Sequence, residues 1–224
     1  MKVSLTDAGK RFNRDWIFRH FTYTFESGTS YAITGPNGSG KSTLLQAISG
    51  SLQLNEGRVE YLKGPSFHFR QATKEDVQRN IKGQLPEEYV FNEVSICAPY
   101  LELIEEMTLK EFLQFHRVFK PMLEGIDDDF IGRAVGLEKT GGKEIRYFSS
   151  GMKQRVKLAQ CIFSDTAVVL LDEPCTNLDA AGIALYHQLI HDYCRERLVI
   201  VSSNDETEYK FCTEYINISN LKNL

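Results

Sequence analysis

The segment Gly35–Thr43, with the sequence GPNGSGKST, constrains the fold of this chain more than any other feature. It follows the apolar run Tyr31–Thr34, which predicts a buried strand, and it precedes a helix predicted from about Ser42 to Ser49 and ended by Gly50. The glycines of the loop allow its backbone N–H groups to turn inward. A strand, such a loop and a helix in this order predict an α/β sheet with an anion-binding loop at its edge.

The loop also carries the side chains that a nucleotide's phosphates require. Lys41 is placed to reach the β- and γ-phosphate oxygens, and the Ser42 hydroxyl is placed to join the shell of a Mg²⁺ ion. The predicted phosphate-binding residues are Gly35, Pro36, Asn37, Gly38, Ser39, Gly40, Lys41, Ser42 and Thr43. This loop predicts binding of a nucleoside triphosphate with Mg²⁺, but by itself it leaves kinases, GTPases and motor ATPases open.

A second motif pairs two carboxylates at the end of an apolar run. The continuous apolar run Ala167–Leu171 predicts a strand buried on both faces, and Asp172 and Glu173 follow it directly. Asp172 is placed to hold Mg²⁺, directly or through water. Glu173 is placed to polarise a water molecule in line with the γ-phosphate. The pair predicts a hydrolytic site in which Glu173 and Lys41 are catalytic.

A third motif, FSSGMKQR at residues 148–155, lies between the loop and the acidic strand, and here the chain resembles the ATP-binding cassette (ABC) ATPases. The signature of that family is usually LSGGQ. This copy keeps Ser149 and Gly151 and departs at Phe148, Ser150 and Met152. Taken in order, the motifs extend the resemblance over essentially the whole chain.

The resemblance implies a site shared between two subunits in a head-to-tail pair. Each ATP would lie between the loop of one subunit and the signature residues of the other, which are Ser149, Ser150, Gly151 and Met152 here. The loop Asn177–Asp179 matches the segment that crosses the interface, and Asp179 is also a good N-cap for the next helix. Phe12 matches the aromatic residue that stacks on adenine, with Trp16 as the second choice.

Two positions depart from the family pattern. The family usually has a Gln that contacts Mg²⁺ and the attacking water, and our alignment places Tyr100 there. It also usually has a His that contacts the γ-phosphate, and Asn204 stands in that place. Asn can donate a hydrogen bond to phosphate, but it can neither carry charge nor shuttle a proton. We therefore expect hydrolysis that persists through Glu173 but is slow or depends on a partner.

The composition of the chain limits the kinds of partner that it can have. No stretch of the 224 residues approaches the roughly 18 apolar residues of a membrane span, and the net charge of −4 offers no bulk basic surface for nucleic acid. We expect a cytoplasmic ATP-binding subunit, peripheral to the inner membrane through a membrane-spanning permease and paired with itself or another ABC subunit. The permease would dock near Tyr100–Met107. Import and export stay open.

Two alternatives also stay open. One is a nucleotide-dependent switch with little hydrolysis, given Tyr100 and Asn204. The other is a soluble ABC ATPase outside transport, although such proteins usually carry two cassettes or a long coiled coil. Five scattered cysteines without a CxxC pair predict reduced thiols.

The fold expected is a P-loop NTPase core, a mostly parallel sheet flanked by helices, with an antiparallel β subdomain and a helical signature subdomain. We expect one ABC ATPase domain over 1–224, with the core and β subdomain at about 1–98 and 164–224 and the helical subdomain at about 99–163. Within it, Asp127–Leu137 predicts a helix, Thr108–Glu111 a capping box, and Asn55–Gly57 a hairpin turn. The charged run Thr73–Lys82 predicts a solvated helix or loop.

Overall fold

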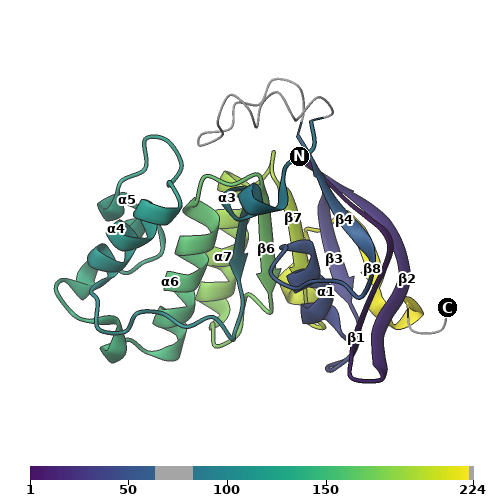
Figure 1. Cartoon of the computed structure of the whole chain (residues 1–224). Helices are drawn as coiled ribbons and strands as arrows, with labels where there is room; N and C mark the ends of the chain where they lie inside the picture. Colours follow the sequence, from purple (N-terminus) through teal and green to yellow (C-terminus); the bar gives the residue numbers. More distant parts are fainter. Residues whose placement is uncertain (64–82, 222–224) are drawn as a thin grey trace.

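A parallel sheet forms the centre of the computed structural model, which describes residues 1–63 and 83–221 (Figure 1). The run Thr73–Lys82 lies outside the described residues. The strand order is β5-β6-β7-β3-β8, and the strands span Val94–Cys97 (β5), Val168–Asp172 (β6), Leu198–Ser202 (β7), Ser30–Thr34 (β3) and Glu214–Asn217 (β8). The order along the sheet departs from the order along the chain because parallel neighbours need crossover connections.

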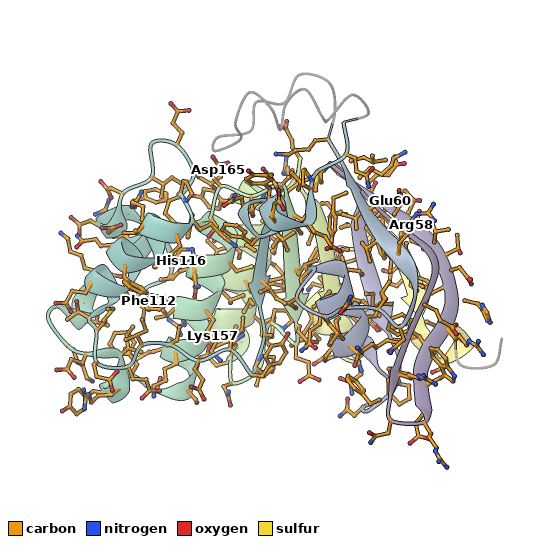
Figure 2. The ribbon with its side chains drawn as sticks, in the orientation of Figure 1. Arg58, Glu60, Phe112, His116, Lys157 and Asp165 are labelled. Carbon is orange, nitrogen blue, oxygen red and sulfur yellow. The ribbon has the colours of Figure 1, made fainter. Side chains whose placement is uncertain are left out.

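An antiparallel sheet covers one side of the parallel sheet, on the right in Figure 1. Its order is β2-β1-β4, with β1 at Lys2–Phe12, β2 at Asp15–Glu26 and β4 at Glu56–Leu62. The predicted turn at Asn55–Gly57 is wrong in one respect, because β4 already begins at Glu56. Gly57 lies so close to the backbone of Thr6 and Asp7 that a Cβ atom would collide with their carbonyl oxygens. On the outer face of β4, Arg58 pairs with Glu60 at 3.2 Å (Figure 2).

Helices pack against both faces of the parallel sheet. They span Lys41–Ile48 (α1), Val90–Glu93 (α3), Leu109–Phe119 (α4), Asp128–Ala134 (α5), Ser150–Phe163 (α6), Ala180–Tyr193 (α7) and Glu206–Tyr209 (α8). Short 3-10 turns span Glu87–Tyr89 (η1), Glu138–Thr140 (η2), Ile145–Tyr147 (η3) and Ile218–Leu221 (η4). Figure 1 shows α4 and α5 lying outside α6 and α7, away from the antiparallel sheet.

Local sequence signals explain most of the helix ends. The capping box predicted at Thr108 is confirmed, since Thr108 and Glu111 exchange hydrogen bonds at the start of α4. The helix predicted over Asp127–Leu137 is shorter than expected. Asp127 caps α5, which ends at Ala134 because Gly136 takes a φ of 66° and the chain turns back, with Leu137 N donating to Gly132 O.

Apolar residues of the central strands alternate between two cores. On β6, Val168 and Leu170 belong to the core shared with the antiparallel sheet and α1, whereas Val169 and Leu171 belong to the core under α4, α6 and α7. All five residues of β6 are buried. The continuous apolar run predicted from the sequence therefore reflects burial on both faces.

The five cysteines are free and buried. Within residues 1–63 and 83–221, none of the helices has the length and apolar character needed to cross a bilayer.

His116 links α4 to α6 inside the helical side of the molecule (Figure 2). Ser164 Oγ donates to Gln160 O at 2.6 Å, so it accepts from His116 Nε2 at 2.9 Å, and Gln160 Nε2 donates to His116 Nδ1 at 3.1 Å. Both ring nitrogens of the neutral imidazole are thus satisfied. Burial, with Lys120 and Arg117 adding to it, lowers the pKa of His116 from 6.5 to about 4.

We predict that His116 contributes to acid destabilisation. Because its folded pKa lies below its unfolded pKa, the unfolded chain takes up this proton first, and stability falls as the pH falls from 6.5 to about 4. The loss, reduced because the ring is only partly buried, is about 1–2 kcal/mol. Urea unfolding of wild type and His116→Gln at pH 7 and pH 4.5 should show a smaller loss for the variant. His191→Gln, on an exposed histidine, is the control, and equal losses in all three proteins would contradict the prediction.

Candidate functional site

The carboxyl ends of β3, β6 and β7 meet at one edge of the parallel sheet. The register pairs Asp172 with Ser202 and Ile33 with Ser202, so the residues that follow these strands emerge side by side. The loop Gly35–Thr43 follows β3, Glu173 follows β6, and Asn204 follows β7 by two residues. Ligands of open α/β sheets bind at this edge.

The glycines of the loop take conformations that other residues rarely adopt. Gly35, Gly38 and Gly40 have φ values of 145°, 73° and 106°. A Cβ atom on Gly40 would also collide with the Ile17 side chain of β2. The loop therefore bends as predicted, and β2 packs directly against it.

Lys41 and the start of α1 present donors at the mouth of the loop. Lys41 is only 5% exposed, and its Nζ donates to Gly35 O at 2.8 Å and Pro36 O at 3.2 Å. No side chain caps α1, so the N–H groups of its first turn, which includes Ser42 and Thr43, remain available to a ligand. The arrangement concentrates positive charge and N–H donors where an anion would bind.

Asp172 has the environment expected of a metal ligand. It is 2% exposed, and its Oδ1 has no hydrogen-bond partner, as is also true of Ser202 Oγ beside it. A buried, unpaired carboxylate oxygen is costly unless a cation or donor joins it. The environment of Asp172 thus fits that of a ligand for a divalent cation such as Mg²⁺.

Glu173 lies at a sharp bend of the backbone directly after β6. Its φ is 44°, an uncommon value for a residue with a side chain, and its N–H donates to Ser202 O at 2.9 Å. Thr176 binds back to Glu173 O through its N–H and its hydroxyl, at 3.2 and 2.9 Å. The bend is therefore held by β7 on one side and by the following turn on the other.

Both residues that depart from the family pattern lie at this site. Asn204 Nδ2 donates to Asn37 Oδ1 in the loop at 3.1 Å. Tyr100 hydrogen-bonds Gln46 of α1, and burial, partly offset by that bond, raises the pKa of its hydroxyl with Asp172 adding to the effect. Tyr100 is nevertheless 48% exposed. Asn204 thus contacts the loop Gly35–Thr43, and Tyr100 contacts the helix that follows it.

The β1–β2 hairpin presents two aromatic rings of different character. Phe12, at the tip, is 48% exposed, with Lys10 Nζ 5.3 Å from its ring centroid. Trp16 is contacted by two guanidinium groups, those of Arg19 at 4.5 Å and Arg11 at 5.5 Å from its ring. Phe12 therefore has the more accessible face for stacking on a base.

The signature residues lie against the loop after β6. Ser149 caps α6 by accepting from Met152 N at 3.2 Å, and Ser149 and Ser150 are exposed. A Cβ atom on Gly151 would lie 2.9 Å from Asn177 O, so only glycine fits at this contact. Asp179 caps α7 by accepting from Gly182 N at 2.8 Å. Among the described residues, no hydrogen bond joins Ser149–Met152 to the phosphate loop of the same chain.

Sequence reasoning missed the residues that hold the loop after Glu173. Gln154 Nε2 donates to Pro174 O at 2.7 Å, and Glu208 Oε1 accepts from Cys175 N at 2.8 Å. Glu208 itself lies in α8, which follows β7, and its Oε2 has no hydrogen-bond partner among the described residues. It therefore connects the segment after β7 with the segment after β6. A single Glu in a short helix carries no sequence signal for such a role.

We predict that Glu208 lowers the stability of the folded protein as the pH rises. It is 5% exposed, and burial raises its pKa above the ordinary 4.5 despite the hydrogen bond from Cys175 N. The folded state therefore releases this proton at a higher pH than the unfolded state, and stability is lost as the pH rises from 4.5 through the folded pKa. Glu208→Gln lacks this loss and keeps an acceptor for Cys175 N. In urea unfolding, the stability of Glu208→Gln relative to wild type should rise between pH 4.5 and pH 7. The stability of Glu206→Gln, a variant at an exposed position, should change with pH as that of wild type does. A constant difference for Glu208→Gln would refute the assignment.

Comparisons with known proteins agree with this geometry. A sequence profile of the family described as "ABC transporter" matches residues 18–176. The "Uncharacterized ABC transporter ATP-binding protein YybJ" of Bacillus subtilis (strain 168) is 29% identical over 209 residues, which cover 92% of this chain and 87% of that protein.

Solved structures share the fold. A putative ABC transporter ATP-binding protein from Pyrococcus furiosus superposes with a TM-score of 0.75 at 20% identity, covering 99% of each chain. A dimeric bacterial ABC transporter cassette superposes with a TM-score of 0.74 at 18% identity, covering 96% of this chain and 94% of that one. On the strength of the family profile, the site geometry and these relatives, the chain belongs to the ABC transporter family, as one of its ATP-binding proteins.

Proposed function

We propose that the protein binds MgATP at the Gly35–Thr43 loop and hydrolyses it at a dimer interface to drive a membrane-spanning partner. The observation that carries this proposal is the convergence of three groups at one sheet edge: the uncapped helix start with Lys41, the unpaired oxygen of Asp172, and Glu173. Ser42 and Asp172 would hold Mg²⁺, which supplies charge neutralisation at the β- and γ-phosphates.

The residues of this chain would divide the remaining work. Glu173 accepts a proton from the water whose oxygen bonds to the γ-phosphorus, while the bond from that phosphorus to the β–γ bridging oxygen breaks. Lys41 stabilises the charge that develops on the phosphates, and Asn204 donates a hydrogen bond to the γ-phosphate from its position on Asn37. Phe12 stacks on the adenine.

A second subunit would complete the site. The signature residues Ser149–Met152 lie at an exposed helix start and contact Asn177 rather than their own phosphate loop. A copy of this chain, or another ABC subunit, would bring its phosphate loop to that helix start, and Asp179 would lie at the same interface. The dimeric cassette that shares the fold supports this arrangement.

The membrane partner would dock beside the tyrosine that contacts α1. Tyr100 and Ile104 are exposed along the segment Tyr100–Met107, and Phe115 and Phe119 are exposed on α4, where their rings contact each other. We propose that residues 1–224 form one cassette, with residues 99–163 as the helical subdomain that receives the partner. The protein would then work at the cytoplasmic face of the inner membrane.

We predict that Glu173→Gln lowers ATP turnover at least 100-fold, the loss usual for a general base. The variant should also trap an ATP-bound dimer, because binding survives while the chemical step stops. Phosphate release measures the first effect, and size-exclusion chromatography with and without ATP measures the second. Exposed Glu138→Gln is the control. Equal turnover in wild type and Glu173→Gln would favour a switch that binds nucleotide without hydrolysing it.

We predict that Tyr100 and Asn204 limit the rate. The double variant Tyr100→Gln and Asn204→His restores the amide and the imidazole that the family usually carries, so turnover should rise roughly tenfold if these two groups contribute as general acid–base and positioning groups do. Steady-state kinetics would test this, with Tyr147→Gln and Asn217→His as exposed controls. A double variant no faster than wild type would show that other residues set the rate.

A further inference from the structure

A cavity of about 520 Å³ lies at the opposite end of the parallel sheet from the phosphate loop. It is formed between α7 and the beginnings of β3 and β7, where Ser30 and Val199 line its wall. The phosphate loop follows the other end of β3, after Thr34. The volume lies within the 300–1,000 Å³ usual for small-molecule sites, and nothing in the nucleotide chemistry uses it.

Positive charge surrounds this cavity. Arg197 donates to Thr166 O at 2.7 Å, Ile162 O at 2.6 Å and Ser164 O at 3.0 Å, all of them neutral acceptors. Within residues 1–63 and 83–221, Arg197 forms no ion pair, and the same holds for exposed Arg195 and Lys210 at the rim. Among the described residues that line the cavity, none is an Asp or a Glu. A concave surface with cations of one sign and apolar walls concentrates the field on an anion.

The walls of the cavity are mostly apolar. Ile190, Val199 and Phe211 line it, and Cys194 adds a thiol that is neutral because burial raises its pKa to about 12. Within the described part of the chain, His187 Nε2 in this wall is buried without a hydrogen-bond partner. The neutral ring can offer Nε2 to an occupant as a donor or as an acceptor, depending on its tautomer.

We propose that this cavity binds a small amphipathic organic acid, with its carboxylate at Arg195 and Lys210 and its apolar body between Ile190 and Phe211. Charge complementarity selects the anion, and the apolar wall selects a hydrocarbon or aromatic body over a bare inorganic ion. The site is distinct from the nucleotide site and does not depend on ATP hydrolysis.

The position of the cavity connects it to the nucleotide site through α8. Lys210 and Phe211 follow that helix directly, and Tyr186, next to His187, donates to Glu208 O at 2.9 Å. Glu208 in turn accepts from Cys175 N, two residues after Glu173. An occupant would thus contact the same short segment that joins the residues after β6 and β7.

The test uses 8-anilinonaphthalene-1-sulfonate as a fluorescent probe and decanoate as a competing carboxylate. The full chain is titrated with saturating MgADP, so that the phosphate loop is filled. Wild type should show saturable probe binding that decanoate displaces. Arg195→Glu with Lys210→Glu should weaken both ligands by roughly tenfold or more, since the attraction of two rim charges becomes repulsion. Both side chains are exposed and form no ion pair among the described residues, so the fold should survive, and thermal melting checks this.

Two controls make the outcome specific. Lys139→Glu with Lys143→Glu makes the same change of charge at exposed lysines near η2, and probe binding should stay within about twofold of wild type if the effect is local. Phe119→Ser removes an exposed ring from the apolar surface of α4 and should also leave binding unchanged. If the rim variant binds like wild type, or if only Phe119→Ser loses the probe, the cavity is not the site and the proposal is overturned.

Discussion

The parallel pairing of β3, β6 and β7 is the constraint on which the rest of this structure depends. Because the strands are parallel and in register, the residues that follow each of them emerge at one edge, with Asp172 opposite Ser202. Burial on both faces holds this register, since a slip by one residue would exchange the side chains that the two cores receive. The site is therefore assembled from segments far apart in the sequence without any side chain having to bridge them.

Contacts between the loops then make this edge a connected unit. Asn204 reaches Asn37, Tyr100 reaches Gln46, and Glu208 joins the segment after β7 to the segment after β6. Gln154 and Gly151 attach the signature helix to the same segment, at Pro174 and Asn177. Direct contacts therefore connect the segments after β6 and β7 with the helix that begins at Ser150. The buried carboxylate of Glu208 is central to that chain of contacts.

The same geometry shows where the two residues that depart from the family pattern lie. Tyr100 and Asn204 are not displaced from the site. Each hydrogen-bonds a residue of the loop or of the helix that follows it. What changes is the chemistry offered there, a phenol in place of an amide and an amide in place of an imidazole. The loop Gly35–Thr43 and the strand end at Asp172 keep the arrangement on which the proposed hydrolysis rests, while these two groups differ.

The sequence by itself determined the phosphate loop, the acidic strand end, the capping box of α4 and the burial of the central strands on both faces. Each of these depends on neighbouring residues, through glycine conformations, helix capping or an unbroken apolar run. The strand order, the start of β4 at Glu56, and the end of α5 at Ala134 were decided by tertiary contacts or by turns that the apolar pattern does not report. The sequence also did not predict the roles of Glu208 and Gln154 or the cationic cavity beside α7. The residues that form these contacts lie on different elements. Hydrogen bonds and charges that join distant segments follow from how the chain packs, and no local pattern of residues specifies that packing.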